Sequence, residues 1–286
     1  MSDLSALGGA QSTVRFHSCP YRLVVCDLDG TLLNDDHRLG EHSRAVLNTL
    51  QDRGVQVLLA SGRHYLDLQR IAEQLGSQGA LISSNGALAH DSQGQMTHCH
   101  PIVPDCLDFL LRDPVFGRAH VNLYRVDGWL VETPKPLLLR YHQDSGFAYR
   151  MTDFATLDES PVLKVFYYAE DPDYLQDLEH RILDRHGDQL DTTYALPVVL
   201  EVMAKGVSKG EALADMVQRL GLNAAEVIAF GDGRNDLEML RYAGKGVLMA
   251  NADPRLKEAL PDLEVIGSNA EESVATYLRT LFGLQV

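Results

Sequence analysis

The sequence predicts an α/β fold in which a parallel-sheet core is interrupted by an inserted α+β domain. Two observations lead to this prediction. At both ends of the chain, short apolar segments suited to buried strands alternate with segments of helical periodicity. In the middle, over residues 88–203, the alternation gives way to strand pairs, and Asp127-Gly128 between two of them is a strong signal for an antiparallel hairpin.

The predicted core comprises residues 21–87 and 204–286, on either side of the insertion. Its first part has the order strand, helix, strand, helix, strand, which is typical of parallel strands joined by crossover helices; these elements are expected at residues 24–26, 41–53, 55–60, 65–75 and 80–83. Its second part continues this order at residues 208–220, 227–230, 237–242, 246–249, 254–260, 264–266 and 272–282. In the insertion, strands are expected within 120–132, 162–169 and 198–203, with a helix at 174–185.

Bulk composition restricts the partners and the compartment. The chain has 286 residues, 45% of them hydrophobic, and a formal net charge of −15, which disfavours nucleic acid and anionic membranes as partners because both bind basic surfaces. No apolar run approaches the ~20 residues of a membrane span. The four cysteines form no C-x-x-C pair, which favours a reducing, cytoplasmic environment. Residues 1–20 lack a signal-peptide pattern and are expected to form a loose tail.

Two carboxylates two residues apart follow the first predicted strand. Side chains alternate along a strand, so Asp27 and Asp29 would point to one side, at the carboxyl end where open α/β sheets bind ligands. Two buried like charges require a cation, and Mg²⁺ prefers carboxylate oxygens. The alternative is a surface turn, since Asp and Gly are common there. The apolar strand before the pair and Leu32-Leu33 after it argue for a buried functional site.

Two further positions suggest an anion site. Ser61 and Gly62 follow the second predicted strand, where a hydroxyl and backbone N–H groups can bind an anion. Lys209 lies at the start of a helix, next to Ser208, and its charge opposes the helix dipole there, so a phosphate partner would account for it. Taken singly, a helix N-cap serine and a solvated lysine are the simpler interpretations.

Another acidic loop follows a strand late in the chain. Asp232, Asn235 and Asp236 lie within five residues, directly after the apolar residues 227–230. This spacing suggests metal coordination with supporting hydrogen bonds, although a glycine-rich loop with an Asp or Asn cap would look similar. It lacks the spacing and the final Glu of an EF-hand loop.

Together these segments resemble the four motifs of the haloacid dehalogenase (HAD) superfamily. The segments are Asp27-Leu28-Asp29-Gly30-Thr31, Ser61-Gly62-Arg63, Lys209 and Gly231-Asp232-Gly233-Arg234-Asn235-Asp236. The second acid, Asp29, is the residue that its phosphatases carry. The insertion resembles the C2-type cap of the Cof-like subfamily, and the nearest likeness is to the YigL-type sugar and pyridoxal phosphate phosphatases. The resemblance covers nearly everything from Tyr21 on and implies a Rossmann-like parallel-sheet core, the HAD fold, with a C2-type α+β cap.

The resemblance implies a two-step phosphoryl transfer to water. Asp27 would be the nucleophile that forms an aspartyl-phosphate, and Asp29 would protonate the leaving alcohol and then activate water. Mg²⁺ would be held by the Asp27 carboxylate, the Asp29 backbone carbonyl and Asp232. The remaining motif residues would assist, with Asn235 and Asp236 supporting the metal site and Ser61, Gly62 and Lys209 binding the phosphate.

The sequence leaves the substrate and the final acceptor open. The resemblance favours hydrolysis of a small phosphorylated metabolite, either a sugar phosphate or pyridoxal 5′-phosphate. A phosphotransferase or mutase would use the same intermediate, and a non-catalytic phospholigand-binding module is a third possibility. Asn85 and Glu201 are candidates for substrate specificity, although Glu201 could equally face the cap core. For Lys164 and Arg125 a solvated face is the simpler expectation. The oligomeric state cannot be inferred.

Overall fold

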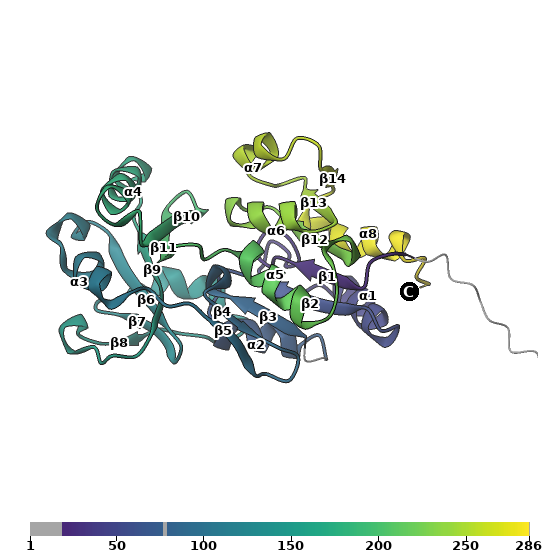
Figure 1. Cartoon of the computed structure of the whole chain (residues 1–286), viewed down its shortest axis with the longest axis horizontal. Coiled ribbons are helices and arrows are strands. Elements are labelled where there is room, and N and C mark those ends of the chain that lie inside the picture. Colours follow the sequence, from purple (N-terminus) through teal and green to yellow (C-terminus); the bar gives the residue numbers. More distant parts are fainter. Residues whose placement is uncertain (1–18, 77–78, 286) are drawn as a thin grey trace, which may run out of the picture.

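The structure is a computed structural model that describes residues 19–76 and 79–285 (Figure 1). Most of the tail expected at residues 1–20 therefore lies outside the described residues. Two sheets form separate parts of the molecule. The larger sheet contains segments from both ends of the chain, and the smaller sheet is built from the middle, as the purple, yellow and teal colours of Figure 1 show. This is the predicted α/β fold with mixed sheets.

The larger sheet has eight strands in the order β14-β13-β12-β1-β2-β3-β4-β5, and the six from β14 to β3 run parallel. Because β1 lies between β2 and β12, the carboxyl ends of these three strands meet at the middle of one sheet edge. The bounds are β1 Leu23–Cys26, β2 Gln56–Ala60, β3 Ala80–Ser83, β4 Leu88–His90, β5 Met96–Cys99, β12 Val227–Gly231, β13 Lys245–Met249 and β14 Glu264–Ile266.

Helices cover both faces of this sheet. Along β1, Val24 and Cys26 pack into one hydrophobic core, and Leu23 and Val25 into another, because successive side chains of a strand point to opposite faces. The first core also receives residues of α1, α2 and α8, and the second those of α5, α6 and α7. The bounds are α1 Glu41–Asp52, α2 Tyr65–Glu73, α5 Lys209–Arg219, α6 Leu237–Tyr242, α7 Pro254–Ala259 and α8 Ser273–Leu281.

The smaller sheet has six strands in the order β10-β11-β9-β6-β7-β8, antiparallel except for β7 and β8. One face packs against α3 and α4, and the other carries a mainly aromatic cluster that includes Tyr124, Trp129, Phe147 and Phe166. The bounds are α3 Pro104–Arg112, α4 Pro172–His186, β6 His120–Arg125, β7 Gly128–Val131, β8 Arg150–Met151, β9 Val162–Tyr168, β10 Leu190–Leu196 and β11 Val199–Ala204.

The structure differs from the sequence expectation at the start of the insertion. The expected boundary is residue 88, but β4 and β5 pair with the larger sheet, so the smaller sheet begins only at β6. The physical cause is the tight turn after β3, where Ser84, Asn85 and Gly86 all adopt positive φ angles and reverse the chain beside β3. Apolar periodicity does not report such a reversal. Helix α3 and strands β8 and β10 were not predicted either.

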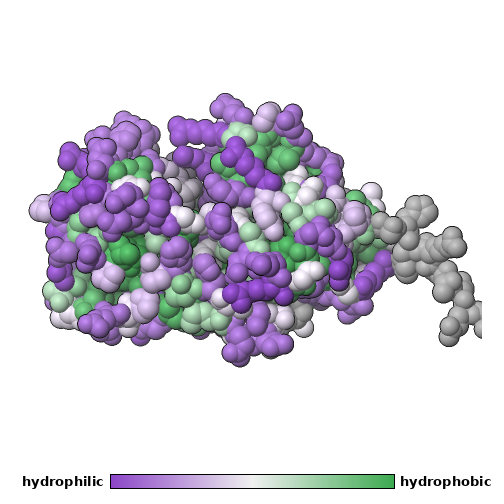
Figure 2. Space-filling view, viewed as in Figure 1, coloured by the Kyte–Doolittle hydropathy of each residue, from purple (hydrophilic) through white to green (hydrophobic). Residues whose placement is uncertain are grey.

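Hydrophilic residues cover most of the face drawn in Figure 2, and hydrophobic residues form separate patches between them. Among the described residues, no helix is both long enough and apolar enough to cross a lipid bilayer.

Candidate active site

The carboxyl ends of β1, β2 and β12 bring the predicted motif residues to one cavity. This cavity measures about 300 Å³, and Asp27, Asp29, Ser61 and Asp232 all line it. Lys209, the first residue of α5, does not line the cavity but contacts Asp27 there. The parallel arrangement predicted from the sequence therefore places motifs that are up to 205 residues apart around one point.

Lys209 is fully buried between two carboxylates. Its Nζ donates to Asp27 Oδ1 at 2.5 Å and to Asp236 Oδ1 at 2.6 Å. Burial alone would lower the pKa of Lys209, but the charges and hydrogen bonds of Asp236 and Asp27 outweigh it and raise that pKa above its usual value. The solvated-lysine interpretation is therefore wrong. The Ser208 hydroxyl accepts from the Glu211 N–H at 3.1 Å and caps α5. This cap sets the start of the helix, and with it the position of Lys209.

Three carboxylates gather around this lysine. One oxygen each from Asp27, Asp232 and Asp236 lies within 4.8 Å of the others, an arrangement that could hold a metal ion. Asp236 Oδ2 accepts from the backbone N–H groups of Asp232 and Gly233, at 2.9 and 2.8 Å, and Thr31 Oγ1 donates to Asp232 at 2.6 Å. A Cβ atom at Gly30 would lie 2.3 Å from Asp232 Oδ2, so a glycine is needed for this close approach.

The charges of the cluster favour an additional cation. Burial raises the pKa of Asp27 well above its usual value, and Asp236 and Asp232 add to this effect against the opposing charge of Lys209. Burial and Asp236 raise the pKa of Asp232 to about 7. One lysine thus does not compensate the three acids, and the oxygen donors are those that a hard divalent cation prefers. The residues fit such an ion.

This electrostatic imbalance predicts how stability depends on pH without metal. A carboxyl whose pKa is higher in the folded chain stabilises the fold below its unfolded value of 3.8, and this stabilisation is lost as the pH rises through about 7. In EDTA, we expect the melting temperature to fall between about pH 5 and pH 8, and MgCl₂ to raise it more at pH 8. The Asp232→Asn variant should show a smaller fall. Equal metal effects at both pH values would contradict the prediction.

The Asp29 carboxylate pairs with Arg63 and lies beside His37. Arg63 Nε donates to Oδ2 at 2.7 Å, and Arg63 Nη2 to Oδ1 at 2.6 Å, while His37 Nδ1 lies 3.0 Å from Oδ1. Burial would raise the pKa of Asp29, but the charge and hydrogen bonds of Arg63, with a smaller effect of His37, hold it well below its usual value. The sequence analysis assigned no role to Arg63 or His37, although Arg63 directly follows Ser61-Gly62.

Ser61 and Gly62 form a buried turn at the end of β2. The Ser61 hydroxyl accepts from the Arg63 N–H at 3.1 Å, and the N-cap of α2 is instead His64, whose side chain accepts from the Leu66 N–H. The N-cap interpretation of Ser61 is therefore wrong. Gly62 lies close to Asn85, because a Cβ atom there would be 2.8 Å from Asn85 Oδ1.

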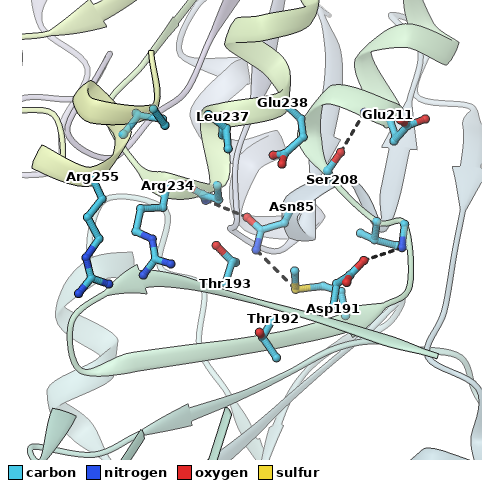
Figure 3. Close-up of a pocket in the computed structure, with 16 residues that line it drawn as sticks. Asn85, Asp191, Thr192, Thr193, Ser208, Glu211, Arg234, Leu237, Glu238 and Arg255 are labelled. Carbon is cyan, nitrogen blue, oxygen red and sulfur yellow. Dashed lines mark hydrogen bonds between the residues drawn. The ribbon is translucent and has the colours of Figure 1, made fainter. Parts of the chain in front are cut away.

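Asn85 and Glu201 belong to a buried polar network beside this turn. Asn85 Nδ2 donates to Glu201 at 2.5 Å, and Asn235 Nδ2 donates to Asn85 at 3.0 Å. Figure 3 shows Asn85 between the core and strand β10, on the wall of an outer cleft of about 570 Å³ that Arg234 and Arg255 also line. Asn235 lines both this cleft and the cavity of the motif residues, and Asn85, which lines only the cleft, binds Asn235 and Glu201.

Lys164 is the fourth member of this network. Its Nζ donates to the Gly62 carbonyl oxygen at 2.7 Å and to Glu201, and its side chain is 2% exposed. Arg125 is also buried, pairing with Asp127 and Asp158 at 3.0 and 2.7 Å. The expectation that both residues lie on a solvated face is wrong. Lys164 lines the cavity of the motif residues, whereas Arg125 does not.

The side of the cavity opposite the motifs is aromatic. It is formed mainly by the smaller sheet and by the 3₁₀ turns η3, Pro136–His142. Its aromatic lining residues are Tyr124, Trp129, Tyr141, His142 and Phe166, whereas His37 lines the cavity beside Asp29. The cavity therefore has one strongly charged end, where Asp27 and Lys209 lie, and one end suited to a flat apolar group.

Comparisons with known proteins agree with this geometry. Residues 24–278 match the family model described as haloacid dehalogenase-like hydrolase. A Haemophilus influenzae protein named as a phosphatase is 41% identical over 93% of this chain and 98% of its own length. An HMP-PP phosphatase of Serratia proteamaculans is 40% identical over 91% and 94%. A haloacid dehalogenase-like hydrolase of Bacteroides thetaiotaomicron has a similar structure, with a TM-score of 0.82, 28% identity and coverage of 92% and 100%. The chain therefore belongs to the haloacid dehalogenase-like hydrolase family.

Proposed function

We propose that this HAD-type phosphatase hydrolyses small phosphomonoesters with Mg²⁺ through an aspartyl-phosphate on Asp27. The observation that carries the proposal is the pairing of Asp27 with Lys209 at the charged end of a cavity whose opposite end is aromatic. A phosphoryl group needs a nucleophile and positive charge at one point, and its leaving group needs a separate surface. Asp27 lines the cavity of about 300 Å³, and Lys209 contacts Asp27 at 2.5 Å without lining the cavity itself.

The proposed metal site uses the residues of the acidic cluster. Asp27, Asp232 and the Asp29 backbone carbonyl would hold Mg²⁺, and Asp236 and Asn235 would support the site through hydrogen bonds. When bound, the ion neutralises charge on the phosphoryl oxygens and aligns the group for in-line attack. The raised pKa values of Asp27 and Asp232 support this assignment, because both carboxylates lack sufficient positive charge without an ion.

The remaining motif residues act on the phosphoryl group and the leaving group. An Asp27 carboxylate oxygen attacks phosphorus while the ester P–O bond breaks, and Asp29 gives its proton to the departing oxygen. Water then attacks the phosphorus of the aspartyl-phosphate and gives its proton to Asp29, while the bond between phosphorus and the Asp27 oxygen breaks; this releases phosphate and restores the Asp27 carboxylate. Lys209, the Ser61 hydroxyl and the Gly62 N–H bind the phosphoryl oxygens. Both oxygens of Asp29 accept from Arg63, which favours the carboxylate form that the second step requires; the first step requires the protonated form of Asp29.

The cavity favours a flat ring as the leaving group. We assign the smaller sheet as a C2-type cap of the Cof-like kind, because its aromatic face closes the cavity over the motif residues. Aromatic walls stack well on planar rings and give a sugar fewer hydrogen bonds. Among small phosphorylated metabolites, pyridoxal 5′-phosphate therefore fits better than a hexose phosphate, as for the YigL-type phosphatases. HMP-PP is a further candidate, because the relative from Serratia proteamaculans is named for it. Asn85 and Glu201 would contribute to specificity through Lys164.

Phosphate release from a panel of phosphorylated compounds, mostly phosphomonoesters, tests the proposal. The panel includes pyridoxal 5′-phosphate, HMP-PP, hexose phosphates and 4-nitrophenyl phosphate, each with MgCl₂ and with EDTA. We expect Mg²⁺-dependent release, with a kcat/KM for pyridoxal 5′-phosphate about tenfold above that for hexose phosphates, in line with the free energy of aromatic stacking. No release from any compound by folded, Mg²⁺-loaded protein would contradict the proposed function. A higher kcat/KM for the sugars would contradict the proposed substrate class alone.

A further inference from the structure

Asp67 is a buried carboxylate that the proposed chemistry does not use. It lies on α2, is 0% exposed and accepts three side-chain hydrogen bonds. Arg63 Nη1 donates to its Oδ2 at 3.1 Å, His142 Nδ1 lies 2.7 Å from the same oxygen, and Ser145 donates to Oδ1. Transfer of a carboxylate from water into the protein interior costs free energy, and an ionised carboxylate can only accept hydrogen bonds. A buried carboxylate therefore needs such donors.

Two of these three donors come from the smaller sheet's part of the chain. His142 and Ser145 belong to residues 141–145, which we call the docking segment. This segment also contacts the core through Arg70, whose Nη1 donates to the Ser145 carbonyl at 2.6 Å, and Gln74, whose Nε2 donates to Asp144 at 3.0 Å. Asp67 therefore has all of its donors only while the docking segment lies against the core.

Arg63 connects Asp67 to Asp29. Its Nη1 binds Asp67, while Nε and Nη2 bind the two oxygens of Asp29. A guanidinium group is planar and rigid, so its contact with one carboxylate determines how it presents itself to the other. Arg63 is 6% exposed and Asp67 0%, so water has little access to their contact, whereas the Asp29 side chain is 39% exposed. The orientation of the Asp29 carboxyl thus depends on where Asp67 is held.

We propose that Asp67 is a positioning residue for the reaction: through Arg63, and with the docking segment in place, it aligns Asp29 with the leaving-group oxygen. The inference rests on the proposed function, because it assigns a support to the acid and base of that reaction. It goes beyond the motifs, since neither Asp67 nor the docking segment belongs to them. Asp29 is therefore aligned only while the docking segment is in contact with the core.

The leaving group provides a readout that a purely structural role would not change. An alkoxide leaves only with a proton, so its departure needs Asp29 as the P–O bond breaks. A 4-nitrophenolate leaves as a stable anion and needs no proton from Asp29. A misaligned Asp29 therefore slows hydrolysis of an alkyl phosphate and spares 4-nitrophenyl phosphate, whereas a general loss of structure slows both equally.

The experiment compares kcat and KM for pyridoxal 5′-phosphate and 4-nitrophenyl phosphate, with Mg²⁺, in five variants and the wild type. Asp67→Asn weakens the Arg63 contact. His142→Phe removes the donor and keeps a ring against Trp129 and Phe147, and Ser145→Ala removes the other donor. Asp144→Asn is the matched control, because it weakens a contact of the docking segment without touching Asp67. Asp29→Asn defines the full effect of losing the acid.

The readout is the kcat for pyridoxal 5′-phosphate divided by the kcat for 4-nitrophenyl phosphate. We expect Asp67→Asn to lower this ratio about tenfold to a hundredfold, with KM nearly unchanged. General acid catalysis contributes at least this much to the rate. His142→Phe and Ser145→Ala should lower it less, and Asp144→Asn should not lower it. If Asp67→Asn does not fold, the other two donor variants decide. An unchanged ratio in the donor variants, with Asp29→Asn lowering it, would overturn the positioning role alone. Inactivity of the wild type on both esters would instead overturn the proposed function.

Discussion

The Asp27→Asn variant is expected to lose phosphomonoester hydrolysis by on the order of 10⁴-fold or more, because an amide oxygen cannot form the acyl-phosphate. The fold should persist. Asp27 is held in place by its backbone, whose N–H donates to the Phe230 carbonyl at 3.0 Å, and by strand β1, whose residues are fully buried. The amide oxygen can still accept the hydrogen bond from Lys209 Nζ.

The same variant should be more stable than the wild type in the absence of metal. Burial and the neighbouring Asp236 and Asp232 raise the pKa of Asp27, so its ionised form destabilises the fold at neutral pH. A neutral amide removes this cost. We therefore expect a higher melting temperature in EDTA and a smaller increase on adding MgCl₂, because one proposed ligand is lost.

The measurements are steady-state phosphate release and thermal unfolding of Asp27→Asn, with and without MgCl₂. Asp36→Asn is the matched control, because Asp36 is an exposed acid of the same segment and should change neither quantity. Turnover by Asp27→Asn within about a hundredfold of the wild type would show that Asp27 is not the nucleophile. A lower melting temperature in EDTA would show that the charge of Asp27 stabilises the cluster after all.

The position of the candidate site residues could be predicted because it depends on topology. Three apolar strands, each followed at once by a polar motif, are sufficient to place Asp27, Ser61 and Asp232 at one sheet edge. The sequence predicts the binding partner of Lys209 less well than it predicts the position of the motifs. Its place at a helix start suggested an anion, and the structure supplies two protein carboxylates there, Asp27 and Asp236.

The contacts between the two sheets could not be predicted in the same way. Lys164 pairs with Glu201 across neighbouring strands of the smaller sheet, and both then reach the core turn at Gly62 and Asn85. These contacts depend on the position of the smaller sheet relative to the core. The hydrophobic periodicity of the sequence predicts strands and helices but not this relative position. A buried lysine within a strand has the same local pattern as an exposed one. For Arg63, adjacency to Ser61-Gly62 was a signal, but its partner Asp29 lies 34 residues away.

Lys209→Ala is expected to impair both stability and catalysis. Its ammonium group is 0% exposed and pairs with Asp27 and Asp236, so its removal leaves the buried acids without their cation. Breaking a buried pair on one side typically costs about 3–5 kcal/mol of unfolding free energy. Loss of a charge that stabilises the phosphoryl oxygens should lower kcat by on the order of 10³-fold.

A second variant separates these two effects. Lys209→Met with Asp236→Asn removes one positive and one negative charge at similar volume, so no added charge is left uncompensated, and the double variant should recover most of the stability. Catalysis should not recover, because the phosphoryl oxygens still lack the ammonium group. Lys205→Ala is the matched control: its ion pair with Asp191 is about half exposed, and its loss should cost at most about 1 kcal/mol.

Denaturant unfolding and kcat at a temperature where every variant is folded distinguish the roles. If the double variant regained both stability and turnover, Lys209 would serve the fold alone, and the phosphate-binding role would be wrong. If Lys209→Ala had the same free energy of unfolding as the wild type, the acids would have to be protonated at neutral pH. The excess negative charge that favours a metal ion would then be absent. If the double variant regains stability but not turnover, the ammonium group of Lys209 is required for the reaction. The chain then folds without this charge, and only catalysis is lost.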